Sequence, residues 1–210
     1  MAATLYQLTM DGTLIRSISV AGFEATPKGI AFDGKFLWMS GDSNLALYQL
    51  DRDGKLIRTI SVAGFETTPK GIAFDGKHLW LVGTASIFIH QLTIDGTLIR
   101  SIDVSTFEQS PVSLTFDGKF LWMSGDSNLA LYQLDIDGTL IRDISVGGVD
   151  LTPTGLTFDG KFLWMTGDSN NKIYQLDRDG KLIRSISVAG FETTPTGLAF
   201  DGQFLWLTGA

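Results

Sequence analysis

The chain contains no cysteine. Disulfides, thiolate metal sites and cysteine nucleophiles are therefore excluded together. Histidine is almost absent too, with two residues, so little imidazole chemistry is available. No stretch approaches the run of about 18 apolar residues that a membrane span needs, and the N-terminus lacks a basic segment followed by an apolar one. From these absences we expect a soluble protein without a membrane partner, cytoplasmic if it is natural.

Positive charge is also in the minority. The sequence has 16 Lys and Arg against 23 Asp and Glu, which gives a net charge of −7. Such a balance disfavours binding to a phosphate backbone as the main activity, so we expect no nucleic-acid partner.

What the sequence does have is a strict repeat. Tryptophan recurs every 42 residues, at Trp38, Trp80, Trp122, Trp164 and Trp206. Two series of Asp-Gly pairs follow the same interval, one beginning at Asp11 and the other at Asp33. Five units of 42 residues therefore account for all 210 residues. Units of this length occur in solenoids, helical arrays and propeller blades, so the secondary structure of one unit decides between them.

One unit, residues 27–62, predicts four short strands and no helix. Apolar or alternating segments at 27–32, 36–39, 45–50 and 55–62 are separated by Asp-Gly turns and a Gly-Asp-Ser-Asn loop. β-branched residues and frequent turn residues are typical of strands, and no segment has the length of a typical helix. The unit is therefore predicted to be a four-stranded antiparallel meander.

Five such meanders bury both their faces only by stacking on one another, and closing the stack into a ring removes its exposed ends. We therefore predict an all-β, five-bladed β-propeller that forms one domain over residues 1–210. A linear stack would need polar capping units, which the sequence lacks. The predicted blades are 27–62, 69–104, 111–146, 153–188, and a fifth made of 195–209 plus 4–20, in which the N-terminal strands 4–20 pair with the C-terminal strands 195–209.

The motifs of the unit resemble a known repeat. Pro153-Thr154-Gly155 opens a strand, Asp168-Ser169-Asn170-Asn171-Lys172-Ile173 follows, and Asp177-Arg178-Asp179-Gly180 forms a turn. This pattern resembles the NHL repeat, which implies a propeller that serves as a binding platform. The Trp of the second strand is also similar to that of bacterial five-bladed proteins related to glutaminyl cyclotransferases. The near-identity of the units indicates recent amplification of one blade, either natural or by laboratory design.

The candidate site lies on the face where the chain enters each inner strand and where the second strand turns into the third. Such longer, variable loops on a rigid scaffold commonly carry recognition. Two sets of acidic residues are expected there: Glu24, Glu66, Glu108, Asp150 and Glu192 before the inner strands, and Asp42, Asp126 and Asp168 in the Gly-Asp-Ser-Asn loops. Lys28 and Lys70 begin two inner strands where Val112, Thr154 and Thr196 stand in the other three, so they break the five-fold symmetry near the channel mouth.

Other motifs are better explained structurally. The Asp-x-Asp-Gly turns lack the further oxygen ligands of a calcium loop, and His78 and His90 have no placed third ligand, so we expect no metal and no cofactor. The tryptophans are expected in the core, with sugar stacking as the alternative.

These observations favour a non-enzymatic scaffold, expected to be monomeric, that binds an unknown small molecule, glycan or protein through the loop face and channel mouth. A multivalent carbohydrate-binding lectin with up to five equivalent sites is the alternative. A channel-site enzyme resembling glutaminyl cyclotransferases is the third hypothesis; no convergent set of acid, base and metal ligands supports it, and no catalytic residue is predicted.

Overall fold

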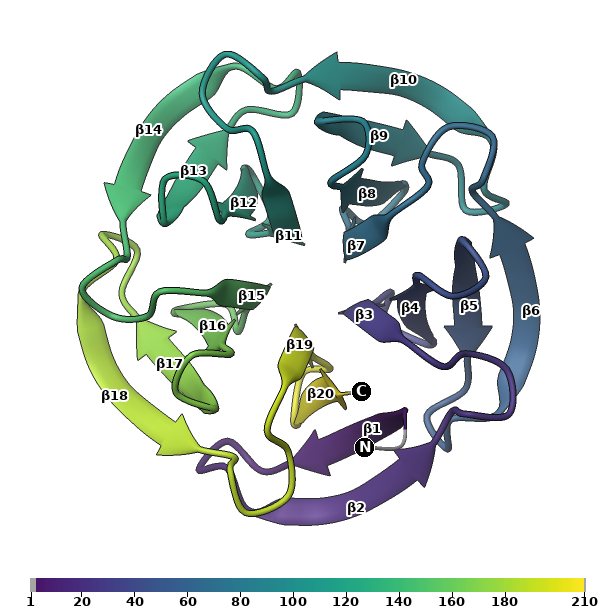
Figure 1. Ribbon diagram of the computed structural model, residues 1–210, viewed down its shortest axis with the longest axis vertical. Helices are drawn as coiled ribbons and strands as arrows, with labels where there is room; N and C mark the ends of the chain where they lie inside the picture. Colours follow the sequence, from purple (N-terminus) through teal and green to yellow (C-terminus); the bar gives the residue numbers. More distant parts are fainter. Residues whose placement is uncertain (1–2, 210) are drawn as a thin grey trace.

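A computed structural model describes residues 3–209 of the chain and shows five four-stranded antiparallel sheets arranged in a ring (Figure 1). Each sheet forms one blade, and its strands follow one another outward from the central axis. The predicted all-β, five-bladed propeller is thereby confirmed.

Two strands of each blade lie closest to the central channel. The innermost strands are β3 (Pro27–Phe32), β7 (Pro69–Phe74), β11 (Pro111–Phe116), β15 (Pro153–Phe158) and β19 (Pro195–Phe200). The second strands are β4 (Leu37–Gly41), β8 (Leu79–Gly83), β12 (Leu121–Gly125), β16 (Leu163–Gly167) and β20 (Leu205–Gly209).

The two outer strands complete each blade. The third strands are β5 (Ala46–Leu50), β9 (Phe88–Leu92), β13 (Ala130–Leu134), β17 (Lys172–Leu176) and β1 (Thr4–Leu8). The outermost strands are β6 (Leu56–Ser61), β10 (Leu98–Asp103), β14 (Leu140–Ser145), β18 (Leu182–Ser187) and β2 (Leu14–Ser19). The third strands are almost wholly buried, whereas the outermost strands consist of exposed and half-buried residues.

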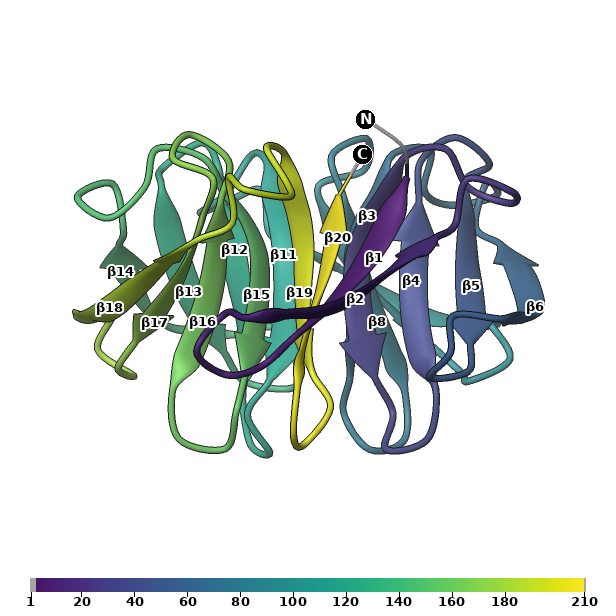
Figure 2. The ribbon, with the colours of Figure 1, turned by 90° about the horizontal axis from the view of Figure 1, so that it is seen from below.

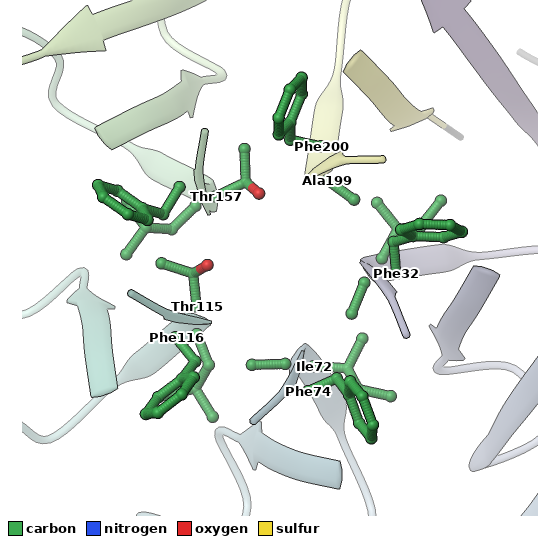
Figure 3. A pocket seen from close by; sticks show the side chains of 14 residues that line it. Phe32, Ile72, Phe74, Thr115, Phe116, Thr157, Ala199 and Phe200 are labelled. Atoms are coloured by element: carbon green, nitrogen blue, oxygen red, sulfur yellow. The ribbon is translucent and has the colours of Figure 1, made fainter. Parts of the chain in front are cut away.

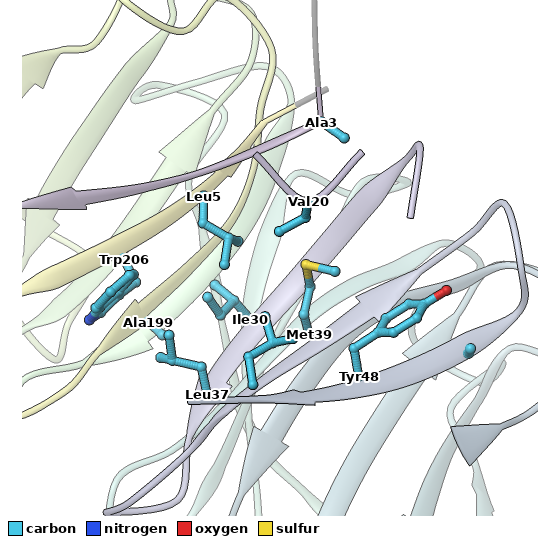
Figure 4. Close-up of a cluster of buried hydrophobic side chains, with 11 residues drawn as sticks. Ala3, Leu5, Val20, Ile30, Leu37, Met39, Tyr48, Ala199 and Trp206 are labelled. Atoms are coloured by element: carbon cyan, nitrogen blue, oxygen red, sulfur yellow. The ribbon is translucent and has the colours of Figure 1, made fainter. Parts of the chain in front are cut away.

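The ring closes where the two ends of the chain share a sheet. Strand β1 pairs with β20 from Thr4 opposite Gly209 to Leu8 opposite Leu205, so this blade has the order β19-β20-β1-β2. Leu5 and Val20 of this blade are fully buried and belong to the same cluster as Leu37 and Met39 of the next blade (Figure 4). Strands from both ends of the chain therefore hold the ring shut, as predicted.

The tryptophans lie in the core. All five side chains have no exposed surface, and each indole Nε1 donates to the aspartate of the turn before it, as Trp38 does to Asp33 Oδ2 at 2.8 Å. The other carboxylate oxygen of Asp33 accepts the backbone N–H groups of Lys35 and Phe36, and Gly34 takes a positive φ of 95°. Sugar stacking on these rings is excluded, because no face of them reaches solvent.

Neighbouring inner strands approach one another closely. A Cβ placed on Gly29 would lie 2.4 Å from the carbonyl oxygen of Lys70 on the next blade, which is too close for any side chain. Glycine at this place therefore allows the inner strands to come together at the loop end of the channel.

The two faces of the disc differ (Figure 2). One carries the loops that enter the inner strands and those that join the second strand to the third; we call it the loop face. The opposite face carries the two Asp-Gly turns of every blade; we call it the hairpin face. Residues 3–209 contain no helix of the length and apolarity that a membrane crossing requires.

Candidate functional site

A cavity of about 180 Å³ lies where the inner strands begin. Its lining consists of the second residue of each inner strand plus one loop residue: Lys28, Lys70, Val112, Thr154, Thr196 and Asp168. We call it the mouth cavity. Because its walls come from all five blades, the closed ring creates it.

The mouth cavity is the place where the repeat loses its symmetry. Two adjacent blades contribute Lys28 and Lys70, whereas the equivalent residues of the other three are valine and threonine. The hydroxyl groups of Thr154 and Thr196 donate to the carbonyl oxygens of Pro195 and Pro27 at 2.7 and 3.0 Å. These threonines help to fix the wall, and the lysines supply its positive charge.

The environment of Lys28 disfavours the positive charge of its own ammonium group. Burial lowers the pKa of Lys28, and the nearby charge of Lys70 lowers it further, while Asp42 and Glu24 act in the opposite direction. The ammonium groups of Lys28 and Lys70 thus lie on the same side of the mouth cavity.

Asp168 is the carboxylate in the lining, and its pKa is shifted in the direction opposite to that of Lys28. Burial raises the pKa of Asp168, and the negative charges of Asp150 and Glu192 raise it further. Asp168 comes from the loop between β16 and β17 in the fourth blade, whereas the lysines come from the first two blades.

None of these three charged groups has an ion-pair partner within residues 3–209. No ion pair of the described chain includes Lys28, Lys70 or Asp168, and their charged ends form no hydrogen bond there. Unpaired charges of both signs around one cavity are a feature that a polar ligand can satisfy.

The five acids before the inner strands have a different environment from the one expected. Glu24, Glu66, Glu108, Asp150 and Glu192 are at most 2% exposed, so they lie behind the loop surface. None of these five predicted ligand-binding residues belongs to the lining of the mouth cavity.

The contacts of Glu24 explain this burial. Its carboxylate accepts the N–H of Thr26 at 2.8 Å, the N–H and hydroxyl of Ser43, and the hydroxyl of Tyr48 at 2.8 Å. A Cβ on Gly41 would lie 2.1 Å from the same carboxylate, so the glycine that ends β4 makes the space for it. Burial raises the pKa of Glu24, but the hydrogen bonds from Ser43, Thr26 and Tyr48 outweigh it and the net pKa is lowered. Through these bonds Glu24 joins the loops to the sheet.

In the second blade, other residues bind the equivalent buried carboxylate, that of Glu66. His90 stands where the first blade has Tyr48, and Ser86 Oγ donates to Glu66 Oε2 at 2.6 Å while lying 3.0 Å from His90 Nε2. The other ring nitrogen of His90 lies 2.9 Å from Ser101 Oγ. His90 is thus an aromatic replacement within a buried hydrogen-bond network.

The loop aspartates are divided by the structure. Of the three equivalent residues, Asp168 lines the mouth cavity and Asp126 is exposed to solvent. Asp42 lies near Lys28, and its charge opposes the lowering of the Lys28 pKa. The sequence did not distinguish among them, because the Gly-Asp-Ser-Asn motif is the same in all three loops.

The other end of the channel has a different character. A smaller cavity of about 90 Å³ is lined by the last residues of the inner strands, including Phe32, Phe74, Phe116, Phe158 and Phe200 (Figure 3). Its lining contains no charged side chain. A charged ligand is therefore better accommodated at the loop face.

The hairpin turns use their acids internally. Asp51 Oδ1 accepts the N–H groups of Asp53 and Lys55 at 2.9 Å, as the turn interpretation expects. Across residues 3–209, no group of three or more His, Asp or Glu side chains has a metal-binding arrangement.

Among the comparisons with known proteins, only the comparison with solved structures gives matches. No protein-family model matches the sequence, and no curated protein sequence is detectably similar to it. Among solved structures, a glutaminyl cyclase from Myxococcus xanthus matches with a TM-score of 0.71 at 14% identity, covering 99% of this chain and 94% of that one. At such low identity the match establishes a common propeller fold and nothing finer.

Two further matches have different activities. A nidogen–laminin complex matches with a TM-score of 0.65 at 15% identity, covering 94% of this chain and 97% of that one. A catalytically inactive virginiamycin B lyase from Staphylococcus aureus, with quinupristin, matches with a TM-score of 0.58 at 18% identity, covering 97% and 70%. The same architecture therefore occurs in enzymes and in a protein–protein complex.

This finding overturns the prediction that the chain is not an enzyme. That prediction depended on the lack of convergent catalytic groups in the sequence, yet the fold is one that a cyclase and a lyase use. The prediction was weak because it considered only residues that are close in the sequence. Ring closure places Lys28, Lys70 and Asp168, from three different blades, around one cavity.

Proposed function

We propose that the protein binds a small carboxylate-bearing molecule in the mouth cavity. The observation that supports this most is the pair Lys28 and Lys70, two half-buried ammonium groups on adjacent blades without an ion-pair partner in residues 3–209. A bound anion relieves their mutual repulsion and replaces lost hydration with charge-assisted hydrogen bonds.

The size of the cavity limits the ligand. At about 180 Å³ the mouth cavity is several times the roughly 30 Å³ of a liquid water molecule and below the roughly 300 Å³ at which drug-sized pockets begin. A small organic anion fits these bounds better than an oligosaccharide or a protein segment.

Methyl NMR tests the proposal directly, because Val112, Thr154 and Thr196 carry methyl groups in the lining. Titration with succinate should shift these methyl signals in a saturable way, while the methyl groups of the fully buried Val62 and Val188 stay in place. The double variant Lys28→Met/Lys70→Met should lose the shifts. The variant Lys35→Met/Lys119→Met changes net charge equally on the hairpin face and should keep them. Equal shifts in both variants would refute the proposal.

Catalysis in the same cavity is a second candidate function. It is favoured by the fold match to a glutaminyl cyclase over nearly the whole of both chains, together with a lysine and an aspartate whose pKa values are moved in opposite directions in one cavity. Incubation with a peptide that begins with glutamine, followed by an assay for released ammonia, tests this candidate. Ammonia release that Lys28→Met/Lys70→Met abolishes would support it; release equal to the buffer control would exclude this reaction.

We also propose an NHL-like origin for the blades, by recent natural amplification or laboratory design. The Pro-x-Gly strand and the Asp-Ser-Asn-Asn-Lys-Ile segment of the fourth blade support it.

A further inference from the structure

We propose that the mouth cavity selects a zwitterion, with the carboxylate of a free amino acid at Lys28 and Lys70 and its ammonium group at Asp168. This inference rests on the proposed function and specifies its ligand. It follows from the distribution of charge around the cavity.

The positive side of the cavity comes from the first two blades. Lys28 and Lys70 occupy equivalent positions on β3 and β7, which are neighbours in the ring (Figure 1). The charge of Lys70 acts on Lys28, and no carboxylate lies within ion-pairing distance of either lysine in residues 3–209. This side therefore attracts a carboxylate.

The negative side comes from the fourth blade and is reinforced from behind. Asp168 lines the cavity, and the buried Asp150 and Glu192 add negative potential at its carboxylate. The oxygens of Asp150 already accept bonds from Ser169, Asn170 and Tyr174, so Asp150 supplies a fixed negative charge. This side attracts an ammonium group.

The two sides do not neutralise each other. Asp168 forms no ion pair with either lysine, and β15 and β16 stand across the channel from β3 and β7 (Figure 1). The cavity thus keeps opposite charges apart over its own width. A ligand that carries both charges satisfies both sides, whereas a simple anion leaves Asp168 without a partner.

The uncharged lining fits a small ligand. Val112 offers an apolar surface, and the hydroxyl groups of Thr154 and Thr196 are engaged with backbone carbonyls. Recognition is therefore assigned to the charged ends of the ligand rather than to its side chain.

Three related ligands test the inference: alanine carries both charges, N-acetylalanine only the negative one and alaninamide only the positive one. Methyl NMR titration of Val112, Thr154 and Thr196 should give at least tenfold tighter binding for alanine than for either derivative. The variant Asp168→Asn should weaken alanine at least tenfold and should not weaken N-acetylalanine. The control Asp143→Asn, at an exposed position on β14, should change neither.

The outcomes separate the two claims. If N-acetylalanine binds as tightly as alanine, the zwitterion inference is wrong and the carboxylate site stands. If neither alanine nor succinate shifts the lining methyl groups while the thermal transition shows a folded protein, both claims fail.

Discussion

Arg58 Nη1 donates to Asp95 Oδ1 at 2.9 Å across the boundary between the first and second blades. The same guanidinium donates from Nε to Gln49 at 2.8 Å and from Nη2 to the Ile94 carbonyl at 2.7 Å, and it lies over the Trp38 ring at 5.1 Å. Arg16, Arg100 and Arg142 repeat this arrangement. One side chain thus joins a blade's own core to the turn of its neighbour.

Replacing Arg58 should cost more stability than replacing its acidic partner. We expect Arg58→Met to lower the free energy of unfolding by about 1.5–3 kcal/mol, since it removes hydrogen bonds from a charged donor. Asp95→Asn should cost less than about 1 kcal/mol, because the Asp95 side chain is 77% exposed and the ion pair is screened. Urea denaturation of both variants measures the difference, and equal losses would show that the ion pair dominates.

Arg184 provides an internal comparison. It donates to Gln175 and to the Met10 carbonyl, and within residues 3–209 it has no ion pair. The loss in Arg184→Met should therefore come within about 1 kcal/mol of the loss in Arg58→Met.

A second prediction concerns backbone conformation in the loops between the second and third strands. Leu129 has a φ of 51°, in the left-handed region, and the equivalent residue of the fourth blade is Asn171 with a φ of 52°. Asparagine tolerates this region better than leucine, for which the cost is about 1–2 kcal/mol. Leu129→Asn should therefore raise the free energy of unfolding by about 1 kcal/mol, and Asn171→Leu should lower it by a similar amount. Denaturant titrations of the two variants with shifts of the same sign would contradict this.

The fold was predictable because its determinants are local and repeated. The 42-residue spacing of Trp38 and its equivalents, with Asp-Gly turns between short strands, defines the blade, and burial of both blade faces requires closure. The hydrogen bond from Trp38 to Asp33 spans five residues, so each unit contains the information for its own turn.

The candidate site was predictable only in part, because it depends on contacts between distant segments. Lys28 and Lys70 stood out since they break the repeat. The burial of Glu24 depends on Ser43 and Tyr48, 19 and 24 residues later, so a polar residue in a loop gave no sign of it. The recurrence of Tyr48, Tyr132 and Tyr174 in phase with these acids was the available signal.

A third prediction concerns the buried Glu66. Burial raises the pKa of this carboxyl, but contacts with His90, Ser86 and Thr68 outweigh it and hold the pKa at about 2, against an ordinary value of 4.5. A lowered pKa means that the ionised form stabilises the fold fully above about pH 4.5 and loses this effect as the pH falls through about 2.

Glu66→Gln should therefore destabilise the protein by about 3 kcal/mol near neutral pH, at about 1.36 kcal/mol per pKa unit. The difference from the unmodified protein should shrink steadily as the pH falls below 4.5, the ordinary pKa of this carboxyl. Urea denaturation at several pH values measures this difference. A difference that stays constant with pH would be inconsistent with an ionised Glu66.

A fourth prediction has the opposite sign and concerns Asp168. Burial, with Asp150 and Glu192 nearby, raises its pKa, so its protonated form is the one that stabilises the fold. This contribution is fully present below the ordinary pKa of 3.8 and is lost as the pH rises through the higher pKa of the folded state. Asp168→Asn should therefore make the free protein more stable at neutral pH, with a gain that fades in acid. Thermal melts at neutral and acidic pH measure this, and destabilisation at neutral pH would show that Asp168 has a favourable partner.

A crystal structure of the protein grown with alanine tests the central claim most directly, because it locates the ligand. The account predicts one alanine in the mouth cavity, with its carboxylate against Lys28 and Lys70 and its ammonium group against Asp168. An empty mouth cavity at a saturating alanine concentration, or alanine bound only between blades or at the hairpin face, would contradict it.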